Sequence, residues 1–108
     1  MKVKVVEKVK FAVGKWKEAG PLMKRFKEVG EKNGYPPFKM YVYISGGDAV
    51  QTLTFESDWD SLARMETLMD RMIADPEMMQ MMQEWAGAVE SHEVSILKEV
   101  SPEELGMM

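Results

Sequence analysis

Apolar and polar side chains alternate along the first stretch of the chain. Valine or phenylalanine occupies most odd positions of residues 3–11, and lysine occupies most even ones. A period of two is typical of a strand with one buried face. Glu7 interrupts the apolar side, which predicts a bulge or a polar pocket at that point. Gly14 ends the strand.

Apolar residues then recur at the spacing of a helix. The stripe covers residues 16–29 and predicts a helix that closes at Gly30 or at the Asn-Gly pair 33–34. A Gly-Pro pair at 20–21 lies inside this pattern. Because proline in a helix removes a hydrogen bond and clashes with the preceding turn, we expect a kink or a restarted helix there.

A second strand follows a Pro-Pro pair. Residues 38–45 alternate again, with Tyr41 and Tyr43 on the side opposite the apolar one. The Gly-Gly-Asp sequence at 46–48 predicts a tight hairpin, because glycine supplies the positive φ that such turns need. The returning strand is expected over residues 49–56.

The remainder of the chain predicts a helical region followed by a last strand. Ser57 is the expected helix cap, and an apolar stripe covers residues 62–72. An Asp-Pro pair at 75–76 is expected to end this helix and cap the next, which continues to about Gly87. The last strand is expected over residues 89–100.

The order strand, helix, strand therefore occurs twice, over residues 2–45 and 48–100. Two such units joined by a hairpin predict an α+β, ferredoxin-like βαββαβ fold, with two helices on one face of a four-stranded antiparallel sheet. At 108 residues the chain is expected to form a single domain over residues 1–100. Residues 101–108 form a short tail, in which a capping-box pattern at Ser101 predicts one helical turn.

Three short sequences carry a family resemblance in addition to this layout: Gly14-Lys15, Phe55-Glu56-Ser57 ahead of Ser61-Leu62-Ala63-Arg64, and Asp75-Pro76-Glu77 ahead of Trp85. The chain resembles the dimeric α+β barrel superfamily, and within it the NIPSNAP-like branch. The resemblance implies a homodimer in which two sheets pack through their open faces. Members of the superfamily include monooxygenases of aromatic substrates, haem-degrading enzymes and lactone isomerases. The first strand departs from the pattern at Val5 and Glu7, where relatives tend to have an acid and an arginine, so no active-site residue is transferred.

Charge is distributed unevenly along the chain. Residues 1–40 have a net charge of +7 and residues 41–108 have −11, which gives −4 overall. A basic surface for anions is one interpretation. The other is that a basic first helix lies beside an acidic second helix, so that the charges cancel locally. Nucleic-acid binding is not expected, because the basic residues are neither arginine-rich nor interleaved with aromatics.

Several classes of function are excluded or disfavoured by composition. The absence of cysteine excludes disulfides and thiolate chemistry. No apolar run reaches the roughly 18 residues of a membrane helix, and the N-terminus lacks a signal-peptide pattern, so no membrane association and a cytoplasmic location are expected. No glycine-rich phosphate loop occurs. No cofactor or metal is assigned, although methionines at 78–82 leave copper(I) binding as an alternative to core filling.

His92 is the only histidine, so a catalytic triad would depend on it. It shares a strand face with Val94 and Ile96, which favours a hydrogen-bonded histidine in a core or interface. A catalytic or ligating role, including that of a haem ligand, is the alternative.

The second set of candidates lies on the opposite side of the second strand. Tyr41 and Tyr43 are expected on the open face of the sheet, and Glu7 joins them if the first strand turns its interruption that way. Glu7, Tyr43 and His92 would then form an acid–base set. The alternative is a dimer interface whose polar groups satisfy one another.

The sequence thus favours a homodimer that binds a small apolar or aromatic molecule, with Tyr41, Tyr43 and His92 as ligand-binding candidates. Turnover would be that of a cofactor-independent monooxygenase or isomerase, with Glu7, Tyr43 and His92 as catalytic candidates. A non-catalytic dimerisation or stress-associated accessory protein is the alternative. A water-filled or ligand-filled cavity in the barrel interior, lined by Tyr41, Tyr43, Glu7 or His92, would favour the first hypothesis. An interior filled by side chains would favour the second.

Overall fold

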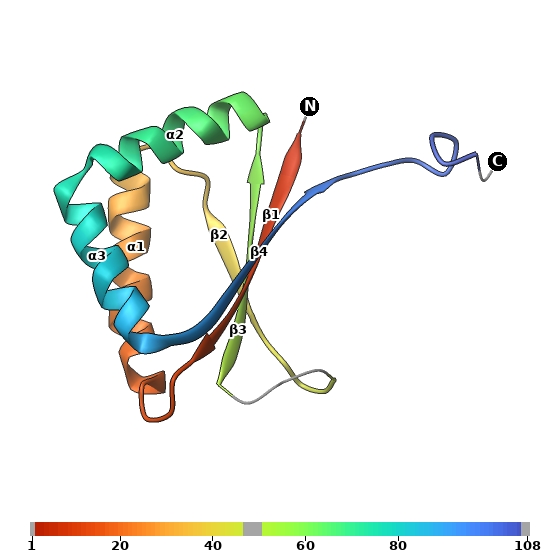
Figure 1. The fold of residues 1–108 in the computed structure, drawn as a ribbon. Coiled ribbons are helices and arrows are strands. Elements are labelled where there is room, and N and C mark those ends of the chain that lie inside the picture. The colour runs from red at the N-terminus through yellow and green to blue at the C-terminus, as the bar shows by residue number, and fades with distance from the viewer. Residues whose placement is uncertain (1, 47–50, 107–108) are drawn as a thin grey trace.

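A computed structural model describes residues 2–46 and 51–106, and it contains the strand–helix–strand unit twice (Figure 1). The elements are β1 (Val3–Phe11), the 3-10 turn η1 (Trp16–Glu18), α1 (Ala19–Lys32), β2 (Phe38–Val42), β3 (Thr52–Trp59), α2 (Leu62–Ala74), α3 (Pro76–Ala88) and β4 (Val89–Lys98). The predicted hairpin at 46–48 and the predicted start of the returning strand fall largely on residues 47–50, outside the described residues.

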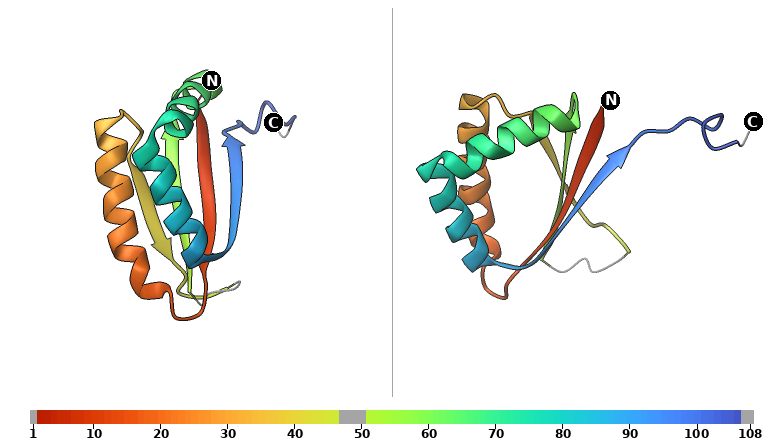
Figure 2. Two further views of the ribbon diagram at one scale, coloured as in Figure 1. Left: turned by 60° about the vertical axis from the view of Figure 1, so that its left-hand side comes forward. Right: turned by 45° about the horizontal axis from the view of Figure 1, so that its top comes forward.

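The four strands form one antiparallel sheet in the order β2-β3-β1-β4. All three α-helices lie on the same face of this sheet, as both views of Figure 2 show. The predicted ferredoxin-like α+β fold is therefore confirmed. Its second helical region is two helices, because Asp75 ends α2 and its carboxylate accepts a hydrogen bond from the Glu77 amide at the start of α3.

The register of β1 determines which side chains face the helices. Val5 and Val9 are buried beneath them, and Glu7 lies on that same side because strand side chains alternate. Glu7 is paired with residues of both neighbouring strands, so the strand has no bulge there. The irregularity lies between Lys10 and Phe11 instead. The alternative in which Glu7 joins the tyrosines on the open face is therefore wrong.

Two expected helix boundaries differ from those observed. Ser57 lies inside β3, because pairing with β1 continues as far as Trp59. The cap of α2 is Ser61, whose hydroxyl oxygen accepts a hydrogen bond from the Arg64 amide at 3.0 Å. Pro21 lies in the first turn of α1, where its missing amide proton costs no helical hydrogen bond. The helix restarts there after η1, and no kink is needed.

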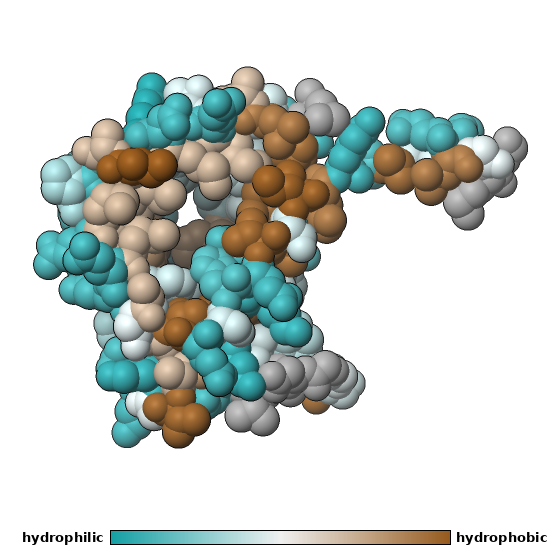
Figure 3. Space-filling model, in the orientation of Figure 1, coloured by the Kyte–Doolittle hydropathy of each residue, from teal (hydrophilic) through white to brown (hydrophobic). Residues whose placement is uncertain are grey.

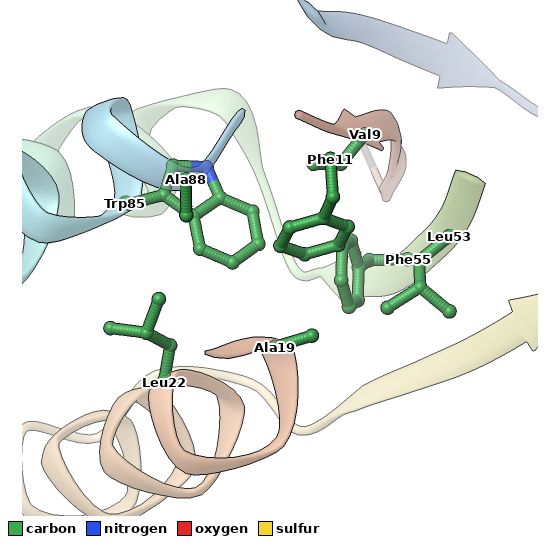
Figure 4. Packing of buried hydrophobic residues seen from close by; sticks show 8 residues of the cluster. All are labelled: Val9, Phe11, Ala19, Leu22, Leu53, Phe55, Trp85 and Ala88. Carbon is green, nitrogen blue, oxygen red and sulfur yellow. The ribbon is translucent and has the colours of Figure 1, made fainter. Parts of the chain in front are cut away.

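The largest core cluster joins both halves of the chain (Figure 4). Its residues come from the sheet, α1 and the end of α3: Val9, Phe11, Ala19, Leu22, Leu53, Phe55, Trp85 and Ala88. Trp85 lies at its centre, with ring centroids 5.3 Å from Phe11 and 5.6 Å from Phe26, both nearly perpendicular to it. This cluster holds α1 and α3 against one end of the sheet.

The opposite face of the sheet is mostly polar. Lys4 forms ion pairs with Glu56 at 3.8 Å and with Asp58 at 3.9 Å on the neighbouring strand. The valines of β1 at positions 3, 5 and 9 do not contribute to this face, because they are buried beneath the helices.

Basic and acidic segments also meet between the helices. Arg25 of α1 forms an ion pair with Glu84 of α3. This ion pair is of the kind that local cancellation implies, and both interpretations of the uneven charge stay predictions. Among the described residues, no helix has both the length and the apolar character needed to span a membrane.

Candidate functional site

A cavity of about 210 Å³ lies between the helices and the sheet. Figure 3 shows a hollow on this side of the molecule, between the helices at the left and the strands. Six aromatic residues line the cavity: Phe26, Tyr35, Phe38, Phe55, Trp59 and Trp85. Four methionines line it as well: Met23, Met72, Met78 and Met82. An interior lined in this way suits an apolar molecule.

Glu7 and His92 form the polar part of this lining. Glu7 Oε1 lies 3.1 Å from His92 Nε2, and Trp85 Nε1 lies 3.4 Å from His92 Nδ1. Because the indole N–H can only donate, Nδ1 is the acceptor and the imidazole proton resides on Nε2. His92 then donates that proton to the Glu7 carboxylate, so the three side chains form one directed chain of hydrogen bonds.

The sheet register brings these residues together from opposite ends of the sequence. In the pairing of β1 with β4, His92 is opposite Val9 and Val94 is opposite Glu7. Glu7 and His92 are thus diagonal neighbours on the helix-facing side. Their side chains are 37% and 30% exposed, so the pair can be reached from solvent.

Two further polar side chains of the lining are fixed by hydrogen bonds. The Tyr35 hydroxyl donates to the Leu68 carbonyl oxygen at 3.1 Å, which ties the loop before β2 to α2. Burial raises the pKa of Tyr35, Asp75 adds to that rise, and Arg71 opposes it. Trp59 Nε1 donates to Ser57 Oγ at 2.9 Å. Both residues hold their polar atoms in place while presenting rings to the cavity.

The structure separates the predicted site residues into two groups. Glu7 and His92 meet in the cavity, whereas Tyr41 and Tyr43 belong to the open face. The Thr54 hydroxyl donates to the Tyr43 hydroxyl at 3.5 Å, and Lys8 Nζ lies 5.9 Å from the Tyr43 ring centroid. An acid–base set of Glu7, Tyr43 and His92 is therefore not formed, because β1 directs Glu7 away from the tyrosines.

Of the residues that line the cavity, only Glu7 and His92 were predicted as site residues from the sequence. Trp85 has helical spacing from the buried Met78 and Met81, which indicated burial but not contact with His92. Tyr35 lies in the loop between α1 and β2 and gave no periodic signal.

The methionines at 78–82 alternate between buried and exposed positions with the spacing of a helix. Met78 and Met81 are buried, whereas Met79 is exposed. Among the described residues, no three histidine or acidic side chains converge as metal ligands.

No protein-family model matches the sequence, and no curated protein matches it. Solved structures do match over nearly the whole chain. A NIPSNAP family protein from Agrobacterium tumefaciens is 15% identical with a TM-score of 0.75, and the match covers 94% of this chain and 95% of that one. A NIPSNAP domain protein from Burkholderia xenovorans is 18% identical with a TM-score of 0.71, covering 94% and 96%.

A structure described as an antibiotic biosynthesis monooxygenase is 12% identical with a TM-score of 0.71, covering 92% of this chain and 99% of that one. At these identities the likeness concerns the fold. The resemblance predicted from the short sequences is confirmed at the level of the fold, which this chain shares with these NIPSNAP proteins and with the monooxygenase structure.

Proposed function

We propose that this protein binds a small apolar or aromatic molecule in the cavity between the sheet and the helices. The observation that carries the proposal is the cavity lining of six aromatic residues and four methionines. A core that only supported the fold would fill this space, because protein interiors pack nearly as densely as organic crystals. The aromatic rings supply flat contact surfaces, and the flexible methionines adapt to the shape of a ligand.

Turnover of the bound molecule would depend on the Glu7–His92 pair. A carboxylate that accepts a hydrogen bond from a histidine can act as the general base for a substrate in the cavity. A cofactor-independent oxygenase or isomerase remains the reaction class that fits these groups, and one structure with this fold is described as a monooxygenase. The tyrosines of the open face have no part in this chemistry.

Binding is tested by native mass spectrometry of gently purified, untagged protein and by equilibrium dialysis against naphthalene. Met82→Phe should reduce binding because Met82 lines the cavity, whereas Met79→Phe on the exposed side of the same helix should not. Circular dichroism confirms that both variants fold. Absence of naphthalene binding up to its solubility limit, or equal binding by both variants, would contradict the proposal and favour the accessory role.

We also propose that the protein is a homodimer in which β4 and the tail contact the second copy. β4 is an edge strand, and its Val94, Ile96 and Leu97 side chains are about half exposed. The segment after β4 projects away from the rest of the molecule in Figure 1, and it exposes Val100 and Leu105. The radius of gyration is 15.6 Å, whereas a compact domain of this length has about 13 Å. A long apolar edge is normally covered.

Sedimentation velocity tests the dimer. Ile96→Glu places a charge on the exposed edge strand and should shift the protein towards monomer. Val13→Glu, at a position that is 92% exposed in the loop after β1, is the matched control and should leave the dimer intact. A monomeric unmodified protein at micromolar concentration would contradict the proposal. Packing through the open sheet face and a cytoplasmic location stay predictions.

A further inference from the structure

Most hydrogen-bond donors that line the cavity already have an acceptor within the protein. The two indole N–H groups donate to Ser57 and His92, and the Tyr35 hydroxyl donates to a backbone carbonyl. The His92 proton is directed to Glu7. These donors are therefore engaged, whereas a carboxylate has about four acceptor positions and Glu7 uses one in these contacts. The Ser57 hydroxyl accepts from Trp59 and keeps its own proton as a neutral donor, and the Glu7 carboxylate is the charged acceptor of the described lining.

The charge of the cavity lining also favours a ligand that donates a hydrogen bond over an anionic ligand. Glu7 is an acid, and no lysine or arginine of the described residues lines the cavity. Trp85 donates to His92 Nδ1 and the Nε2 proton is directed to Glu7, so His92 offers a ligand no free N–H group. An anionic ligand would meet a like charge at Glu7 with no cation to offset it. A ligand with a hydroxyl or ammonium group would instead donate to a charged acceptor, which gives one of the stronger hydrogen bonds.

The size of the cavity limits the apolar part of the ligand. Its volume is about 210 Å³, and an apolar protein cavity of about 150 Å³ holds benzene. One or two fused rings therefore fit within the lining, while a larger ring system would extend through the opening.

We infer that the cavity selects a flat molecule of one or two rings bearing a hydrogen-bond donor, which donates to the Glu7 carboxylate, and that it rejects the corresponding anion. This inference rests on the proposed function, because it specifies the ligand of the same cavity. His92 acts as a positioning residue, because it orients the Glu7 carboxylate through its Nε2 proton.

Three probes of one size test the selection: 2-naphthol, which donates, 2-methoxynaphthalene, which only accepts, and 2-naphthoate, which is an anion. Equilibrium dialysis with absorbance detection gives the dissociation constant of each at neutral pH. A hydrogen bond to a charged group predicts that 2-naphthol binds at least about tenfold more tightly than either of the others. Equal or tighter binding of 2-naphthoate by the unmodified protein overturns the inference.

Glu7→Gln removes the charge at nearly constant shape and should bring 2-naphthol and 2-naphthoate to within about threefold of each other. Glu56→Gln is the matched control, because Glu56 lies on the open face in an ion pair with Lys4. It should leave the ratio unchanged. A ratio unaltered by Glu7→Gln also overturns the inference. Should that variant not fold, the comparison on unmodified protein decides alone.

The same experiment separates this inference from the proposed function. If all three probes bind the unmodified protein equally and Met82→Phe weakens all three, the cavity binds aromatic molecules without selecting a donor, and only the inference fails. If no probe binds up to its solubility limit, both fail. Preferential binding of 2-naphthol that is lost in Glu7→Gln supports both.

Discussion

Replacement of Trp85 by alanine should nearly unfold this protein. The side chain is 6% exposed and its ring contacts Phe11, Phe26 and Phe55, with centroids between 5.3 and 6.2 Å apart. Burial of a tryptophan removes about 150–250 Å² from water, which is worth about 4–6 kcal/mol as an upper estimate. Measured tryptophan-to-alanine losses in cores are about 3–5 kcal/mol. Total stabilities of about 5–15 kcal/mol leave little margin for such a loss.

Trp16→Ala is the matched control for this prediction. Trp16 is 40% exposed and has one ring contact, with Phe11 at 5.7 Å, so its loss should cost about 1 kcal/mol. Thermal unfolding followed by far-ultraviolet circular dichroism, at one fixed protein concentration, measures the stability of both variants. Trp85→Ala should lower Tm by more than about 12 °C, and Trp85→Phe, which keeps a ring in the cluster, should lower it less. Equal destabilisation by Trp85→Ala and Trp16→Ala would refute the assignment of the core centre to Trp85.

Three further predictions concern single contacts. A double-mutant cycle of Arg25→Ala and Glu84→Ala should give a coupling of about 0.2–1 kcal/mol that falls with added salt, because both side chains are partly exposed; a salt-independent coupling would contradict this. Asp75→Ala should cost about 1 kcal/mol through loss of the α3 cap, whereas Asp75→Asn should largely retain it, as chemical denaturation would reveal. Burial raises the pKa of Tyr35 above its usual 10.0. At a pH just above 10, the unfolded chain has therefore lost the Tyr35 hydroxyl proton while the folded chain retains it. The free energy of unfolding consequently falls as the pH rises above about 10. Tyr35→Phe should show a shallower decline above pH 10, and identical slopes would exclude the effect.

The choice of helix cap shows where sequence reasoning reaches its limit. Ser57 and Ser61 both precede the apolar stripe of α2, and both are suitable caps. The difference lies in β3, which remains paired with β1 until Trp59 lies opposite Val3. That pairing joins segments more than fifty residues apart, so no local pattern near either serine could reveal it. The strand and helix types themselves followed from periodicity, because lysines mark the polar face of β1 clearly.

The candidate site was predictable in part for the same reason. The alternation of β1 places Glu7 on the side of Val5 and Val9, and the sequence identified that interruption as a polar pocket or a bulge. The partner of Glu7 was not predictable. His92 is 85 residues away, and a shift of one residue in the β1–β4 register would direct its side chain to the other face. Only the complete sheet determines that the two side chains meet.

The division of the second helical region explains why a cavity lies beside Glu7. Proline at 76 cannot continue the preceding helix, and Asp75 adopts an extended conformation between α2 and α3. The two helices therefore lie at an angle, with α3 beside α1 and α2 crossing the other end of the sheet (Figures 1 and 2). Met72 near the end of α2 and Met78 at the start of α3 both line the cavity formed in that angle. A single straight helix would lack this angle, and the same Asp-Pro pair that interrupts the helix thus creates the space into which the Glu7 carboxylate is directed.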